Sequence, residues 1–472
     1  MTVYFLANAV TQRIFVAMTD IFGRRIMLYS AVVIFTIGTV VLSATPALFP
    51  ILIVGRALQG LGSGGMVAIP SEMLIEMIPT QRRSRYNCII LLCAAIGVGT
   101  GPVVGGLFTE NGSAEGAMAW RWIYWISAPY CLVLLIAIPF AVQPVGEFLS
   151  PTMRLLSIDW TGVSIFSASM AGLLIGITWS GGGDPSTNWR TLLALVAGGI
   201  GMMCWLLYER SGATKPLVSF SILRKSPLTF FCIFLHTLLV SKITVDRRER
   251  FAEEIQMFGQ VFYIPVYLRE VHQLTPSLTA AHLAAITATT CVVAAIIGVI
   301  TARFGHFRWA IWFGWALNIV ASTCMILFDT ATGLGICAAV FAVAGLGHGL
   351  TISASHTAIE RLADTSSVCD AALIANFLQA GGMCLAVAAV GASFQSRMMF
   401  HMVELGAPKL AAEVLVESLQ FGVDNISFPP SLAEISRHAY ALSFHDLMQA
   451  LTVLAGFGGF LSLFLGWTAK RR

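Results

Sequence analysis

Arg56 is the charged residue whose place in the sequence most suggests chemistry, because it lies inside the apolar run of residues 50–71. A guanidinium within a membrane helix is costly unless it faces the interior of a helix bundle or a water-filled cavity. In such a place, its fixed positive charge can lower the pKa of a nearby carboxyl and couple proton binding to another ligand. The alternative is that Arg56 extends from the outer end of the helix to the membrane surface.

No carboxylate in the sequence is an obvious partner for Arg56. Glu72 and Glu76 share a helix face but lie roughly 24 and 30 Å farther along a straight helix. We expect these two carboxylates to pair with the arginines that follow them. His348 and His356 could titrate near neutral pH, although a hydrogen-bonded packing role is the expected one.

A second charged group lies between the first and second apolar runs and contains Asp20, Gly23, Arg24 and Arg25. A carboxylate, a turn glycine and paired arginines in a short loop can form charge pairs with a neighbouring helix end and stabilise one conformation. The alternative is a basic loop that only orients the chain in the membrane.

Small residues recur inside the apolar run of residues 87–108. Gly97, Gly101 and Gly105 are spaced by four, so they share one helix face and would allow a second helix to approach closely, and Gly106 follows them. Pro102 removes a backbone donor and bends the helix. The pattern predicts either a moving interface or a static packing seam.

The composition places these residues in a membrane protein. Of the 472 residues, 57% are hydrophobic and 11% are charged, which is typical of a chain that crosses the bilayer many times. The ten cysteines stand singly, without the spacing of a zinc site or a disulfide framework. No basic stripe with interleaved aromatic residues suggests nucleic-acid binding. No metal-ligand cluster, nucleophile elbow or phosphate-binding glycine loop suggests an enzyme or a cofactor site.

Runs of about 18 or more mainly apolar residues predict an all-α protein with thirteen membrane crossings. The predicted spans are residues 2–17, 29–45, 50–71, 87–108, 121–141, 158–179, 190–208, 228–268, 280–302, 308–328, 334–357, 369–394 and 445–468.

The basic residues predict the orientation of these spans. If the loop with Arg24 and Arg25 is cytoplasmic, most Lys and Arg residues of the other loops fall on the same side, as membrane topology favours. The sequons at Asn111 and Asn425 then lie outside, where they could be glycosylated.

Two polar stretches interrupt the pattern. Residues 241–256 contain eight charged side chains, SKITVDRRERFAEEIQ, and separate two apolar pieces that are each too short to span. We interpret this block as an extra translated segment from an imperfect gene model; an excursion that splits the span and a regulatory loop are the alternatives. Residues 395–444 are mixed in character and are predicted to form a long external loop.

Four stretches together resemble the major facilitator superfamily, and in particular its 14-span drug:proton antiporter branch. They are the charged loop from Asp20 to Arg25, the arginine motif that contains Arg56, Gln59 and Gly60, the glycine and proline motif 97–106, and the aromatic stretch 120–125. Further similarity is found at residues 79–86, 179–182, 376–377 and 381–382, so the resemblance extends over nearly the whole chain.

The resemblance implies two helical bundles that rock about a central, largely apolar cavity. The N-terminal bundle would comprise residues 1–141, with an extra two-span region at 142–227. The C-terminal bundle would comprise residues 228–394 with the insertion 241–256, followed by the external loop 395–444 and by the last span and basic tail at 445–472. The implied activity is export of small organic compounds from a plasma or internal membrane, in exchange for protons, by a monomer without a cofactor.

The sequence also departs from the family pattern. The thirteen spans align with the second to fourteenth helices of the branch, so the first helix, which carries an acidic residue in the family, has no counterpart among them. Val16 stands where the first motif has glycine, and Gln379 where arginine is common. These departures keep open a degenerate, nontransporting paralogue or receptor, and an importer or uniporter of the same fold.

Overall fold

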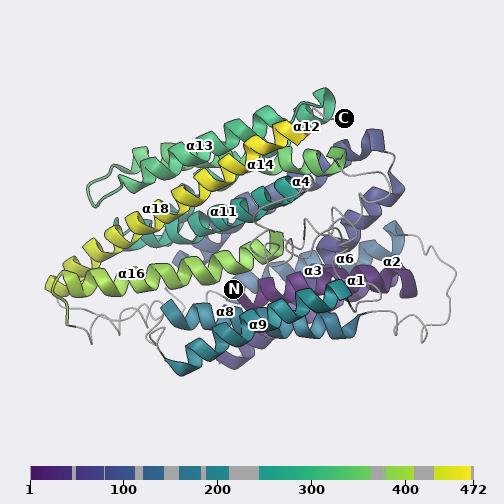
Figure 1. The fold of residues 1–472 in the computed structure, drawn as a ribbon, viewed down its shortest axis with the longest axis horizontal. Coiled ribbons are helices and arrows are strands. Elements are labelled where there is room, and N and C mark those ends of the chain that lie inside the picture. The colour runs from purple at the N-terminus through teal and green to yellow at the C-terminus, as the bar shows by residue number, and fades with distance from the viewer. Residues whose placement is uncertain are drawn as a thin grey trace.

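The computed structural model describes residues 2–44, 49–78, 80–111, 121–142, 159–181, 188–211, 244–362, 376, 379–408 and 430–468. Throughout these residues the ordered elements are helices (Figure 1). In the N-terminal half they are α1 (Thr2–Phe22), α2 (Arg24–Ala44), α3 (Phe49–Met77), α4 (Thr80–Asn111), α5 (Trp122–Trp125), α6 (Ser127–Ala141), α8 (Trp160–Gly181) and α9 (Trp189–Ser211). The C-terminal half contains α11 (Thr244–Glu270), α12 (Pro276–Phe304), α13 (Arg308–Ile326), α14 (Leu334–Leu362), the π-helical turn η4 (Ala386–Val390), α16 (Gly391–Glu404) and α18 (Pro430–Thr468).

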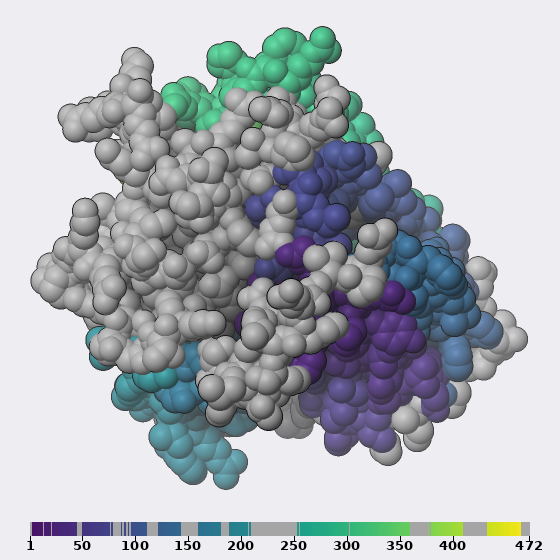
Figure 2. Space-filling model, turned by 90° about the vertical axis from the view of Figure 1, so that its right-hand side faces the viewer, coloured from purple at the N-terminus to yellow at the C-terminus, as the bar shows by residue number. Residues whose placement is uncertain are grey.

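The helices form two groups that lie side by side (Figure 1). One group contains α1, α2, α3 and α6 together with the α8–α9 pair, and the other contains α11 to α14, α16 and α18. Helix α4 belongs to the first half of the sequence but packs along α12 of the second group. It therefore connects the two groups. Figure 2 shows the side of the molecule on which this helix lies next to the first helices.

Apolar residues account for both the cores and the outer surface. At one end of the second group, the ring of Tyr267 stacks on Phe444 and Phe328, with ring centroids 4.5 Å and 5.9 Å apart. On the outside, large apolar side chains such as Leu132, Val133 and Phe140 of α6 are exposed, Phe140 by 85%. Such a surface is suited to lipid rather than to water.

Nine helices of the described residues are long and apolar enough to cross a membrane. They lie at Arg24–Ala44, Pro50–Ile75, Trp122–Ala141, Trp160–Ser180, Pro276–Thr301, Arg308–Ile326, Leu334–Ala358, Gln379–Glu404 and Leu432–Leu463. The predicted spans 2–17, 87–108 and 190–208 are also helical, as α1, α4 and α9.

Most of the charged block 241–256 lies within a helix. From Thr244 it forms the first turns of α11, which continues without a break to Glu270, while residues 228–240 lie outside the described part. Glu253, Gln256 and Gln260 are spaced by about one helical turn, so they share one face of α11. The same face carries Ile264 and Tyr267 farther along, and all five side chains are buried. Counting charges along the chain did not reveal this buried polar face.

The predicted external loop 395–444 is also much shorter in the structure. Helix α16 continues to Glu404, and α18 begins at Pro430, a residue that suits the first turn of a helix. The early turns of α18 carry charged residues, which hid it from an apolar-run criterion, yet Tyr440 and Phe444 are buried in the core. Between these helices the structure describes residues 405–408.

Candidate functional site

An aromatic pocket of about 230 Å³ lies between α11 and the helix that contains η4 and α16. Phe258 and Phe262 face it from successive turns of α11, and Phe394 faces it from α16, where its ring centroid lies 4.6 Å from that of Tyr263. The remaining walls are aliphatic or glycine, apart from one amide. The lining residues are Phe258, Gly259, Phe262, Tyr263, Val266, Ala386, Val387, Phe394 and Gln395.

Two features connect this pocket to the rest of the fold. Phe5 of α1 contacts Phe258 edge to face, with centroids 5.6 Å apart, so the first group of helices reaches the pocket's edge. Ala386 and Val387 belong to the π-helical turn, a rare distortion that is frequent at functional sites. The pocket therefore lies where one helix is locally distorted and where the two helix groups meet.

The Gln395 side chain supplies the pocket's one amide. Its Oε1 atom is buried and has no hydrogen-bond partner among the described residues. A buried, unpaired acceptor costs about 1–3 kcal/mol, which a ligand that donates a hydrogen bond would recover. The residues around the pocket thus combine aromatic surface with one amide whose Oε1 has no partner in the described structure.

Arg56 lies in a second polar site, formed by α2, α3 and α5. Its guanidinium donates to the Tyr124 hydroxyl at 2.6 Å and to Gln59 Oε1 at 3.3 Å, and it lies 5.0 Å from the centre of the Tyr124 ring. Gln59 in turn donates to Thr39 Oγ1 at 2.9 Å. In the described part of the chain, Arg56 is therefore held by a phenol and an amide, and neither Glu72 nor another carboxylate contacts it.

A chain of buried hydrogen bonds extends from this site between α1 and α3. Asn8 donates to Ser63 at 2.8 Å, and Gln12 donates to Asn8 at 2.8 Å. Near the other end of α3, Glu72 is buried and accepts from Thr19 at 3.3 Å. The expected pairing of Glu72 and Glu76 with arginines involves side chains outside the described part.

The second helix group contains its own buried polar network, on α11, α13 and α14. Ser322 accepts from Gln256 at 3.1 Å and from Gln260 at 3.0 Å. His348 Nε2 lies 3.0 Å from Gln260 Oε1, which requires a proton on that nitrogen, and Asn318 is 3.5 Å from its Nδ1. The packing role expected for His348 is confirmed, since the residue is fully buried and hydrogen-bonded.

Glu253 extends this network toward the start of α11. Its carboxylate is 1% exposed and accepts a short hydrogen bond from Thr351 of α14. A charged group that the sequence placed in an intrusive segment is therefore accommodated in the bundle interior. The periodicity of Glu253, Gln256 and Gln260 was the signal that could have revealed it.

In the glycine motif on α4, Gly106 makes the close helix approach that the structure describes. An added Cβ at Gly106 would lie 2.6 Å from Ala280 Cβ on α12. A side chain added at Gly97, Gly101 or Gly105 would meet nothing within 4 Å among the described residues. The helix contact predicted for these three glycines therefore stays a prediction.

The remaining predicted site residues are only partly visible. Gly23 adopts a φ of 83°, which confirms it as the turn glycine between α1 and α2, and Arg24 and Arg25 beside it are half-buried. Gly60 packs against the α1 backbone at Tyr4. The side chains of Asp20 and Asn111, and all of Asn425, lie outside the described part.

Comparison with known families decides what this arrangement represents. The sequence profile of the Major Facilitator Superfamily matches residues 1–387. The chain belongs to the major facilitator superfamily. It is therefore a multi-pass membrane transporter rather than an enzyme, and the resemblance noted in its motifs is confirmed.

Relatives within the superfamily are fungal transporters. The chain is 27% identical to MFS transporter L2 of a Phoma species, over 98% of this chain and 74% of that protein. It is also 27% identical to the MFS-type efflux pump LUC4 of a Fusarium species, over 84% of this chain and 66% of the pump, and to efflux pump FUS6 of Gibberella fujikuroi, over 86% and 69%.

Solved structures show the same superfamily fold at low identity. A proton-dependent oligopeptide transporter aligns over 100% of this chain and 90% of its own, with a TM-score of 0.60 and 11% identity. The human organic anion transporter MFSD10 aligns over 96% and 82%, with a TM-score of 0.51 and 11% identity.

Proposed function

We propose that this superfamily member exports small aromatic organic compounds across the membrane in exchange for protons. Two similar proteins are named efflux pumps, which supports the outward direction. A plasma-membrane location suits that direction. Import, uniport and a nontransporting receptor are the competing functions, and the experiment below separates them.

The aromatic pocket is the observation that carries the proposal. Its volume of about 230 Å³ is suited to a compact ligand, somewhat below the usual size range of drug-binding pockets. Phe258, Phe262 and Phe394 offer ring surfaces on which a planar ligand can pack. The unpaired Gln395 Oε1 selects a ligand with an N–H or O–H donor.

The proposed coupling site is the polar group around Arg56. The guanidinium is fixed by Tyr124 and Gln59, and Gly60 brings the α1 backbone close to the same helix. A positive charge held in this way would lower the pKa of a carboxyl that a conformational change brings near it. Arg56, Gln59 and Gly60 are thus proposed to link proton binding to the movement of the bundles.

The proposed movement uses the two bundles of the superfamily fold. Gly106 allows contact with α12 of the other bundle, while a side chain at Gly97, Gly101 or Gly105 would meet no atom of the described residues. Pro102 lies inside α4 between these positions and weakens its backbone hydrogen bonding. The turn at Gly23, Arg24 and Arg25 is proposed to favour one of the two conformations, with Asp20 as its acidic member.

The test is binding and export of naphthol, a planar aromatic alcohol that can donate to Gln395. Purified protein in nanodiscs should bind naphthol, and Phe258→Ala should weaken binding by about tenfold, because it removes one aromatic wall. Phe400→Ala is the matched control, since Phe400 lies on α16 but is exposed by 55%. Cells that express the protein should also lose preloaded naphthol faster than cells without it.

The outcomes distinguish the competing functions. Binding without faster loss indicates a receptor, and faster uptake indicates an importer. Loss that does not respond to a proton gradient indicates a uniporter. Equal weakening by Phe258→Ala and Phe400→Ala would refute the pocket as the binding site.

A further inference from the structure

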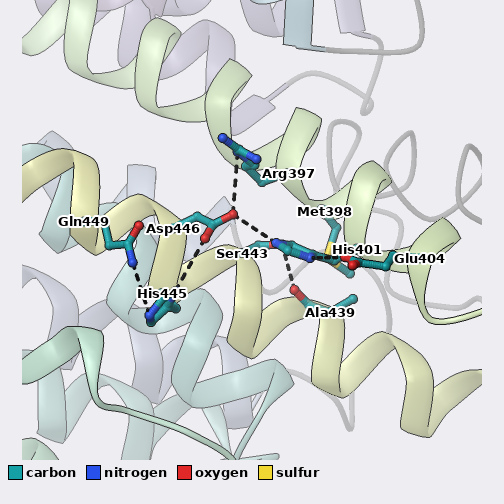
Figure 3. Close-up of polar contacts among 9 residues, drawn as sticks. All are labelled: Arg397, Met398, His401, Glu404, Ala439, Ser443, His445, Asp446 and Gln449. Carbon is teal, nitrogen blue, oxygen red and sulfur yellow. Dashed lines mark hydrogen bonds and ion pairs between the residues drawn. The ribbon is translucent and has the colours of Figure 1, made fainter.

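A cluster of titratable side chains joins α16 to α18 outside the sites described above (Figure 3). At its centre is His401, whose side chain is 11% exposed. Its Nε2 lies 2.9 Å from Asp446 Oδ2 on α18, and its Nδ1 lies 3.3 Å from Glu404 Oε2 on α16. Both nitrogens of one buried ring therefore face carboxylate oxygens.

This geometry suits a doubly protonated ring. A neutral imidazole carries one N–H, so it can donate to one carboxylate only, and the lone pair of its other nitrogen then faces the second carboxylate. An imidazolium donates to both. We propose that His401 binds a proton between Asp446 and Glu404, and that this proton fastens α16 to α18.

The charges around the ring favour the same protonation state. Arg397 lies 3.6 Å from Asp446 Oδ2, and His445 lies 3.4 Å from Asp446 Oδ1. With both histidines neutral, the cluster contains two carboxylates and one guanidinium, and one proton on His401 balances its charge. Helix α8 and the turn η4, which also pack against α16, have no titratable side chains within their bounds.

The position of His401 connects the proton to the substrate pocket. Phe394 and Gln395, which line the pocket, precede His401 by about two helical turns on α16. The π-helical turn η4 lies directly before α16, and its weaker hydrogen-bond geometry makes it a suitable hinge. A proton that fixes α16 on α18 therefore also fixes one wall of the pocket, and should change the affinity of the pocket for its ligand. This effect on affinity rests on the proposed function.

The first test needs no transported compound. Thermal unfolding of the protein in nanodiscs is followed between about pH 8 and about pH 5.5, the range in which histidine changes charge. On acidification, the wild type should gain about 2 °C in Tm relative to His401→Gln, because only the wild type takes up the stabilising proton. His438→Gln, which replaces an exposed histidine of α18, should follow the wild type.

Two further variants make the outcome decisive. Asp446→Asn should abolish the acid-dependent gain although His401 is present, and Glu404→Gln, at a side chain that is 61% exposed, should reduce it. If Asp446→Asn does not fold, Glu404→Gln still tests the proposal. An identical pH dependence of Tm in the wild type, His401→Gln and Glu404→Gln would overturn it.

A second measurement tests the connection to the pocket. Naphthol affinity should change by at least about fivefold between the two pH limits in the wild type, and should be constant in His401→Gln. A pH-dependent Tm with no naphthol binding leaves the proton site standing and refutes the proposed ligand. Naphthol binding with no difference in Tm between wild type and variant refutes the proton site alone.

Discussion

The Tyr124 hydroxyl accepts a 2.6 Å hydrogen bond from Arg56, and the same guanidinium lies 5.0 Å from the centre of the Tyr124 ring. The aromatic stretch 120–125 thus supplies a specific partner to the one arginine of α3. This contact holds the guanidinium among protein groups, which favours the bundle-facing interpretation of Arg56 over the alternative of extension to the membrane surface.

Arg56→Ala should abolish proton-dependent export and leave membrane insertion intact. The substitution removes the fixed positive charge, and Gln59 and Tyr124 can still hydrogen-bond to water or to each other. Uptake into inside-out vesicles under an imposed pH gradient measures this export, with protein content in the membrane as its control. Undiminished export by the variant would contradict the assigned role.

Tyr124→Phe should have a smaller effect than Arg56→Ala. It keeps the ring next to the guanidinium and removes a hydrogen bond to a charged group, which is worth about 1.5–3 kcal/mol. We expect partial loss of export in the same vesicles. A loss as complete as that of Arg56→Ala would show that the hydroxyl itself takes part in coupling.

Gln395→Leu should change the ligand preference of the pocket. The wild type should bind naphthol more tightly than naphthalene, because only naphthol donates to Gln395 Oε1, an atom without a partner in the described structure. The variant should bind both about equally. Calorimetric titration of the two compounds gives the ratio of their affinities. An unchanged preference for naphthol in Gln395→Leu would show that the naphthol hydroxyl donates to another group.

Gly106→Ala and Gly97→Ala should have opposite effects on stability. The added methyl at Gly106 would be 2.6 Å from Ala280 Cβ and 2.7 Å from the Pro276 carbonyl oxygen, so α4 and α12 must separate. At Gly97 the methyl meets no described atom, and the better helix propensity of alanine is worth about 1 kcal/mol. The midpoint of thermal unfolding should fall for the first variant and rise or stay constant for the second; the reverse order would contradict the helix contact.

Gln260→Ala should destabilise the second helix group by about 1–3 kcal/mol, because it leaves the buried His348 Nε2–H without its acceptor and removes one of the two donors to Ser322. Gln449→Ala, at an exposed position of α18, is the matched control and should have little effect. Chemical unfolding of the two variants gives the comparison. If Gln260→Ala is as stable as Gln449→Ala, other groups must replace the hydrogen bonds of Gln260.

His272 should give a pH dependence of opposite sign to that of His401. It lies outside the spans, and burial together with nearby Arg437 lowers its pKa. The unfolded chain therefore binds a proton at His272 more readily than the folded protein does. The contribution of neutral His272 to stability is present above its ordinary pKa of 6.5 and is lost as the pH falls. His272→Asn should weaken the loss of Tm in acid, and a steeper loss would contradict this sign.

The fold was largely predictable from sequence because its determinants are local. The apolar runs predict the helices, and the turn at Gly23 and the motif around Arg56, taken together with the other motifs, indicate the superfamily. The substrate pocket was not predictable, since Phe258 and Phe394 are far apart in sequence and ordinary apolar helix residues when considered alone.

The errors have a common physical origin. Glu253 was judged by its charge, while the side of the helix that it faces depends on neighbours distant in the chain. Asp446 was overlooked because the predicted final span began next to it and the helix before it was assigned to a loop. In both cases the partner, Thr351 or His401, was absent from the local pattern.

Proton movement in proteoliposomes tests the central claim most directly. Liposomes with an acidic lumen and an internal pH dye receive naphthol from outside. The wild type should raise the luminal pH faster than Arg56→Ala and faster than protein-free liposomes, because each molecule of naphthol that enters releases protons. A luminal pH that follows the same course in all three preparations would contradict proton-coupled transport by this protein.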